Sequence, residues 1–121
     1  MMEFLTTILA GLLASLISNT AFPQDVMRGK DVFSVCAPCH AADDNGIGPK
    51  LAGIVNRQAG SVAGFRYSRA MENAKISWDD STLDAYLADP QKVVPGNLMP
   101  FSGIAETGKR ADLIAYLKTL K

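Results

Sequence analysis

Both cysteines of the chain and its only histidine fall in one five-residue stretch, Cys36-Ala37-Pro38-Cys39-His40. Thiols three residues apart lie about one helical turn from each other, so each can add to one vinyl group of a haem. The next residue then presents an imidazole to the iron from the same face. This spacing predicts a c-type haem site, with thioether bonds at Cys36 and Cys39 and with His40 as the proximal iron ligand.

Three other sites would use the same side chains. A disulfide between Cys36 and Cys39 would close a very small loop and would not need His40. A thioredoxin-like redox pair would require a preceding strand and a βαβ pattern, neither of which is visible. A structural zinc site needs four ligands, so a carboxylate would have to complete it. We favour haem attachment, because the motif and its context agree.

The size and charge of the chain limit what it can do. With 121 residues it forms one small domain at most, and its 12 basic and 12 acidic residues leave no basic excess that would suggest nucleic acid. A chain of this length builds only a modest core. A haem tethered inside it would supply much of that core, so we expect the haem-free chain to be largely unfolded.

The N-terminal residues 1–21 are predicted to be a signal peptide. The apolar run Phe4–Ile17 is too short for a membrane span of about 20 residues but fits the apolar core of a signal. We expect cleavage near Ala21, with retention of the segment as a membrane anchor as the alternative. In both cases residues 22–121 form an exported haem domain in the bacterial periplasm, because bacteria attach haem covalently outside the cytoplasm.

The apolar spacing predicts three main helices and an all-α fold. The first covers residues 24–37 with Asp25 near its N-terminus, the second ends near Ala88, and the third covers residues 108–120. Ser77, Asp79 and Asp80 are the candidate caps of the second helix. A short helix is expected at residues 68–74, and no alternating strand pattern stands out. The long irregular stretches between these helices are unusual in a small domain, and wrapping a haem would explain them.

A haem held by His40 alone would leave the sixth iron position open. Met99 is the favoured second ligand, because the stiff segment Pro95–Phe101 can lay a thioether across the distal face of a haem. Met71 is the reserve candidate, and core filling is the ordinary role of a methionine. Ligation by histidine and methionine favours ferrous iron and raises the reduction potential.

The sequence resembles class I cytochrome c, and specifically its mitochondrial and bacterial c2-like branch. The similarity covers about Val26 to Lys121. It implies three main helices, plus short helices and long loops, around one covalently attached haem c. The residues that carry it are Gly29 and Phe33, Cys36 to His40, Gly48-Pro49, Gly53, Arg57, Gly64 to Ser68, Ile76 to Trp78, Leu83, Tyr86-Leu87, Pro95 to Ile104 without Ser102, and Asp112 to Leu117.

The resemblance also implies roles for single residues around the haem. The Pro49 carbonyl would accept the proton of the second ring nitrogen of His40. Trp78 and Tyr67 would hydrogen-bond a haem propionate, and Arg57 would offset its charge. Core packing for the two aromatic residues and a solvated position for the arginine are the alternatives.

On the distal side, the resemblance implies that Tyr86 lies near the Met99 sulfur. Gly29 would lie where the terminal helices cross. Two residues depart from many relatives. Leu98 stands where lysine is common, which removes a cation from the haem edge. Met71 stands where a small polar residue is common, which would make the inner pocket drier.

A haem closed by two axial ligands has no open site for substrate and changes oxidation state with little rearrangement. We therefore expect a one-electron carrier and not an enzyme. It would work as a monomer between respiratory or photosynthetic partners such as a cytochrome bc1-type complex, a terminal oxidase or a reaction centre. The alternative is a peroxidase-like haem enzyme or a gas-binding sensor with a labile distal methionine.

The exposed haem edge would be the docking surface. No strong lysine ring is visible near it, and Asp43 and Asp44 are close in sequence. We expect mainly apolar docking with weak salt dependence. The residues expected around the edge are Ala37, Pro38, Ile47, Leu98, Phe101 and Ile104.

Overall fold

Helices and long connecting loops make up the computed structural model, which describes residues 11, 13–15 and 24–121. The helices are α1 (Val26–Phe33), α2 (Arg69–Glu72), α3 (Asp80–Ala88), α4 (Pro90–Val93) and α5 (Thr107–Leu117). Within those residues no strand is present, and the β-type pairing is an isolated antiparallel bridge between Gln58 and Ser77. The predicted all-α class is confirmed.

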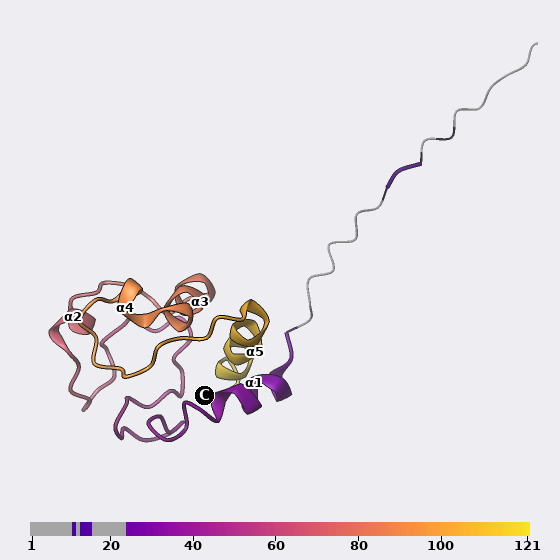
Figure 1. The fold of residues 1–121 in the computed structure, drawn as a ribbon. Coiled ribbons are helices and arrows are strands. Elements are labelled where there is room, and N and C mark those ends of the chain that lie inside the picture. Colours follow the sequence, from indigo (N-terminus) through magenta and orange to yellow (C-terminus); the bar gives the residue numbers. More distant parts are fainter. Residues whose placement is uncertain (1–10, 12, 16–23) are drawn as a thin grey trace, which may run out of the picture.

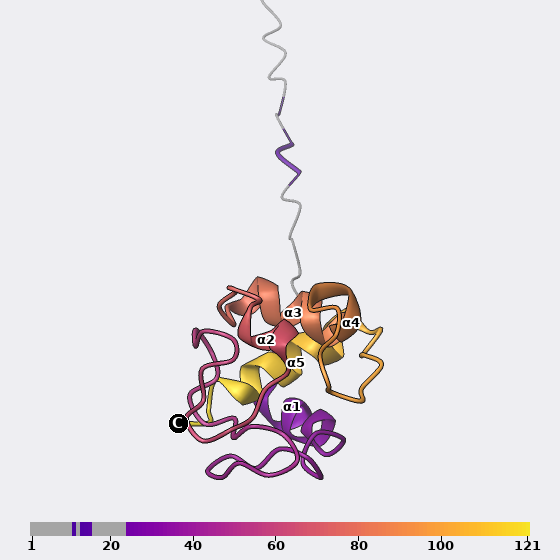
Figure 2. The same ribbon diagram turned by 90° about the vertical axis from the view of Figure 1, so that its left-hand side faces the viewer.

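The terminal helices cross closely, and both views show α1 lying against α5 (Figures 1 and 2). Gly29 allows this contact, because a Cβ atom there would overlap the backbone carbonyl of Asp112. The rings of Phe33 and Tyr116 pack beside the crossing with their centroids 5.1 Å apart. The backbone N–H of Asp25 donates to the Asp112 carboxylate at 2.8 Å, which fixes the start of α1 against α5.

Each of the first four helices begins at a side chain that accepts a backbone N–H in its first turn. The four caps are Asp25, Ser68, Asp79 and Asp89. Asp25, which was expected near the N-terminus of the first helix, is its cap, and Asp79 is the one of the three candidates that caps α3. Helix α4 was not predicted. Asp89 ends α3, and the following proline, which suits a first helical position, starts α4.

Two predicted helix ends are wrong by several residues. The first helix was expected to run to Ala37 but ends at Phe33, and hydrogen-bonded turns continue the chain. In these turns the N–H of Cys36 donates to the Phe33 carbonyl at 2.8 Å, and the N–H of His40 donates to the Cys36 carbonyl at 3.0 Å. The last helix ends at Leu117 instead of Leu120.

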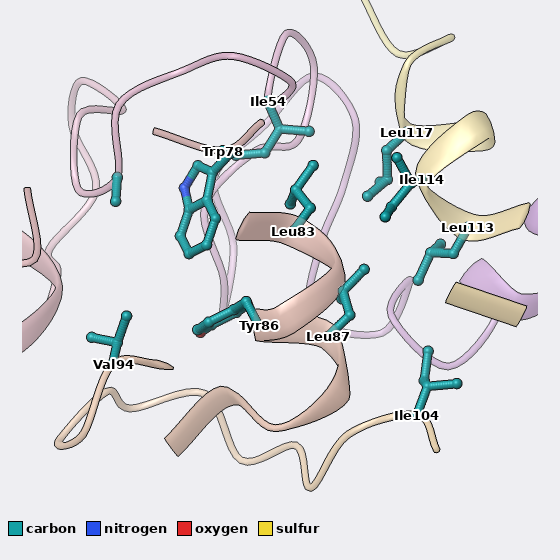
Figure 3. Close-up of a cluster of buried hydrophobic side chains, with 11 residues drawn as sticks. Ile54, Trp78, Leu83, Tyr86, Leu87, Val94, Ile104, Leu113, Ile114 and Leu117 are labelled. Carbon is teal, nitrogen blue, oxygen red and sulfur yellow. The ribbon is translucent and has the colours of Figure 1, made fainter. Parts of the chain in front are cut away.

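The core lies between α3 and α5. Figure 3 shows Leu83 and Leu87 on α3 between Trp78 and Tyr86 on one side and the leucines of α5 on the other. Leu113 of α5 is only 1% exposed. The aromatic side of α3 faces away from α5 and is therefore available to form the wall of a site.

The predicted signal peptide, residues 1–21, lies outside the described residues apart from residues 11 and 13–15. Among the residues that are described, no helix has the length and apolar character that a membrane span requires. The signal peptide or anchor stays a prediction.

Candidate functional site

A cavity of about 310 Å³ opens beside the aromatic side of α3. This volume lies in the range of pockets that hold small-molecule ligands, about 300–1,000 Å³. Most of its lining side chains are apolar. All of the predicted site residues line this one cavity, namely Cys36, Cys39, His40, Pro49, Arg57, Tyr67, Trp78, Tyr86 and Met99.

The turns after α1 place both thiols at one wall of the cavity. Cys36 and Cys39 are half-buried free thiols. Burial raises the pKa of the Cys36 thiol, and the neighbouring Cys39 raises it further. Neither sulfur is paired in a disulfide, so both are available for thioether bonds.

The imidazole of His40 is held from two directions. Its Nδ1 lies 2.9 Å from the carbonyl oxygen of Pro49. Gly48 lies against the ring, and a Cβ atom there would overlap it. Because a carbonyl oxygen can only accept, Nδ1 carries the hydrogen and Nε2 keeps its lone pair for a metal.

Met99 lines the cavity from the loop that follows α4, where its side chain is partly buried. The Tyr86 hydroxyl donates to the Met99 sulfur at 3.9 Å. Burial raises the pKa of Tyr86 to about 12, so the phenol stays neutral and remains a donor at physiological pH. Met71, the reserve candidate, also lines the cavity.

A third part of the wall carries the polar residues expected near haem propionates. The Tyr67 hydroxyl accepts the backbone N–H of Val62 at 3.0 Å, and burial raises the pKa of Tyr67. The Arg57 guanidinium donates to the backbone carbonyls of Lys50 and Ala52. Both of these acceptors are neutral backbone groups, so neither of them offsets the positive charge of Arg57.

The rim of the cavity is apolar, but only some of the residues predicted for it lie there. Ile47 and Leu98 are 75% and 77% exposed and line the cavity, as expected for a docking surface. Ile104 was predicted at this edge, but it is buried at 9% exposure and belongs to the core. Val35 was not predicted there, yet it is 61% exposed and lines the cavity.

Two buried polar residues were also missed, one in the cavity wall and one outside it. Asn97 is 6% exposed and lines the cavity beside Met99. Arg110 is 9% exposed and donates to Asp84 and to the backbone carbonyls of Ile104 and Ala105. Asn97 lies in the segment that carries the family resemblance, but no role was predicted for it, and an arginine on a helix ordinarily faces solvent.

The cavity fits a porphyrin better than a zinc ion. Within the described chain, no cluster of three or more histidine, cysteine, aspartate or glutamate side chains is placed to hold a metal ion. The lining instead offers one oriented imidazole and the thioethers of Met99 and Met71 in mainly apolar surroundings, with two free thiols beside them. These donors suit a covalently attached haem, whose own nitrogens supply the equatorial ligands.

A helical fold wrapped around such a cavity defines the class of the protein as a c-type haem protein. A family model described as cytochrome c matches residues 26–121. The chain belongs to the cytochrome c family.

Relatives and solved structures agree with this family. Cytochrome c of Chlamydomonas reinhardtii is 47% identical over 98 residues, which cover 78% of this chain and 88% of the relative. Cytochrome c2 iso-2 of Magnetospirillum fulvum is 47% identical over 90 residues, covering 73% of this chain and 94% of the relative. The structure of cytochrome cH from Methylobacterium extorquens superposes with a TM-score of 0.77 at 43% identity, covering 78% of this chain and 98% of that one.

The comparisons confirm several predictions. The resemblance to class I cytochrome c is correct, and the protein has the fold of that class. It binds one covalent c-type haem with iron and is an electron carrier rather than an enzyme. It therefore works with redox partners, and nothing in the comparisons favours a peroxidase-like enzyme or a gas sensor.

Proposed function

We propose that this electron carrier holds its haem through thioether bonds at Cys36 and Cys39, with His40 and Met99 as axial ligands. The observation that carries the proposal is that His40 and Met99 line one cavity and that each has a partner suited to orient its donor atom. The Pro49 carbonyl holds the imidazole, and the Tyr86 hydroxyl contacts the sulfur.

A haem held by these residues would supply one-electron chemistry, with an electron received from a redox donor and passed on to an acceptor. The residues set the conditions for this exchange. His40 keeps its Nε2 lone pair toward the metal because Nδ1 donates to Pro49. The thioether of Met99 is a soft ligand that favours the ferrous state, and the apolar lining disfavours water and added charge.

The polar part of the wall has a proposed role toward the haem propionates. Tyr67 uses its oxygen to accept from Val62 and keeps its own hydrogen to donate. Arg57 contributes a positive charge that would offset the charge of a propionate. Trp78 is 6% exposed and packs against Tyr86 at a centroid distance of 4.7 Å, so its indole ring is held in place to donate.

The apolar rim is the proposed docking surface, which we define as Val35, Ile47 and Leu98. Each of these side chains is more than half exposed and lines the cavity mouth. Partners such as a cytochrome bc1-type complex, a terminal oxidase or a reaction centre would meet the protein, as a monomer, through this surface. We further propose a periplasmic location for residues 22–121, after removal of residues 1–21 or with that segment as a membrane anchor.

The intact mass of the exported protein after denaturation tests haem attachment at these residues. We expect the mass of the polypeptide plus one haem, and we expect Cys36→Ser and Cys39→Ser each to remove one thioether bond. Wild-type protein with the mass of bare polypeptide would overturn the proposal. Carbon monoxide added to the reduced protein at neutral pH tests ligation, because rapid stoichiometric binding would show an open or labile distal position.

A further inference from the structure

We propose that Asn97 is a positioning residue for Met99, and that it slows the replacement of the Met99 sulfur by other iron ligands. Its buried carboxamide holds the loop that presents the thioether. This inference rests on the proposed ligation by Met99.

The side chain of Asn97 joins the Met99 backbone to α4, at its first residue Pro90 and at Val94, which directly follows its last. Its Nδ2 donates to the carbonyl oxygen of Pro90 at 3.1 Å and to that of Val94 at 2.9 Å. Its Oδ1 accepts the backbone N–H of Met99 at 2.9 Å. One buried carboxamide therefore uses both of its donor hydrogens and its acceptor to fix one loop.

The anchor to which Asn97 connects is part of the core. Pro90 is less than 2% exposed, and Val94 is 3% exposed and belongs to the main apolar cluster. Asn97 itself is 6% exposed, so water cannot readily replace its hydrogen bonds. The Met99 backbone is thereby tied to a rigid base through a single intervening side chain.

Gln91 braces the same loop from the solvent side. Its Nε2 donates to the backbone carbonyl of Asn97 at 2.9 Å. Its Oε1 accepts the backbone N–H of Gly96 at 3.1 Å. The loop that carries Met99 is therefore held by two carboxamides, one buried and one exposed.

Loss of the Asn97 side chain would destabilise the closed form of the loop more than the open form. An alanine there leaves the Pro90 and Val94 carbonyls and the Met99 N–H without these partners, and such buried groups are costly. Water satisfies them when the loop swings away, so the open form becomes more populated. An external ligand reaches the iron through that open form, so its binding rate reports the population directly.

The test measures the rate at which imidazole displaces the sulfur ligand in the ferric holoprotein. The loss of the sulfur-to-iron charge-transfer band reports this displacement. We expect Asn97→Ala to accelerate displacement roughly tenfold, the effect of losing about one well-formed buried hydrogen bond. Gln91→Ala, which loses exposed bonds, is expected to give a smaller acceleration of roughly threefold. Asp112→Asn is the control, because it weakens the helix crossing away from this loop and is expected to leave the rate unchanged.

The outcomes separate this inference from the proposal on which it rests. If the wild-type ferric protein lacks the sulfur band, ligation by Met99 itself is wrong. If the band is present and Asn97→Ala exchanges at the wild-type rate, or if Asp112→Asn accelerates exchange equally, the positioning role alone is wrong. Should Asn97→Ala fail to fold, Gln91→Ala decides, and a wild-type rate in that variant overturns the inference.

Discussion

The Nδ1 atom of His40 donates a hydrogen bond to the Pro49 carbonyl oxygen across a distance of 2.9 Å. This contact fixes both the tautomer and the orientation of the imidazole, so Nε2 is left to bind a metal. Gly48 makes the geometry possible, because the backbone can approach the ring only where no Cβ is present. The proposed iron ligand is therefore positioned both by the close approach of the Gly48 backbone and by the hydrogen bond to Pro49.

Substitution of Gly48 by alanine tests this close approach. The added Cβ would overlap the His40 ring, so the ring or the loop must shift. We predict that Gly48→Ala lowers the free energy of unfolding of the holoprotein by about 1–3 kcal/mol and changes the reduction potential. Denaturant titration and potentiometry measure the two effects. Gly46→Ala is the control, since a Cβ there makes only an ordinary contact at 3.7 Å, and equal effects in both variants would refute the explanation.

Removal of the Tyr86 hydroxyl tests its contact with the Met99 sulfur. Without that donor the thioether gives more electron density to ferric iron, so we predict a lower reduction potential for Tyr86→Phe. A weak hydrogen bond of about 0.5 kcal/mol corresponds to roughly 20 mV for one electron. Tyr116→Phe is the control because Tyr116 packs against Phe33 at the helix crossing. An unchanged or raised potential in Tyr86→Phe would contradict the prediction.

The Asp112 carboxylate makes stability depend on pH. The backbone N–H of Asp25 lowers the pKa of Asp112 most, and the Arg28 guanidinium lowers it further, while burial opposes both. A carboxyl whose pKa is lower in the folded state stabilises the fold above its unfolded pKa, about 3.9, and loses that contribution as pH falls through the folded value.

We predict that Asp112→Asn lowers the free energy of unfolding by about 1 kcal/mol at pH 7, since the amide cannot replace both charge-assisted bonds. The difference from wild type should shrink as the pH falls below about 4. Denaturant titrations across pH measure it. Asp43→Asn, at an exposed loop position, should differ little from wild type at any pH. If the difference in unfolding free energy between Asp112→Asn and wild type grew in acid, the predicted direction of the pH dependence would be wrong.

The apolar rim predicts how electron transfer depends on salt. With a purified bc1-type complex as donor, we expect the stopped-flow rate to change by less than about threefold between low and physiological ionic strength. Leu98→Ser should slow the reaction at every ionic strength. Met27→Ser is the matched control, because Met27 is 70% exposed on α1 but does not line the cavity. A steep fall of the wild-type rate with salt would refute apolar docking.

The sequence could predict the features that depend on local chemistry. The attachment motif stands in one short stretch, and the caps at Asp25 and Asp79 follow from a side chain's reach to the next turn of its own helix. The family resemblance predicted that Tyr86 lies near the Met99 sulfur, and the structure shows this contact at 3.9 Å.

The features that were missed depend on packing between distant segments. Nothing local distinguishes the buried Asn97 from an ordinary loop asparagine, because its burial comes from the core residues beneath α4. Arg110 is likewise buried because the loop carbonyls of Ile104 and Ala105 fold back onto α5. The misplacement of Ile104 at the cavity rim has the same cause, since adjacent loop residues turn to opposite sides only once the loop has packed.

Ligation by Met99 is the central claim, and ferric absorption spectra of Met99→Ala and Met71→Ala holoproteins test it most directly. Both sulfurs line the cavity, so the two variants remove comparable side chains from the same surroundings. The account predicts that the sulfur-to-iron charge-transfer band disappears in Met99→Ala and persists in Met71→Ala. A band that survives the loss of Met99, or that is lost only with Met71, would contradict it.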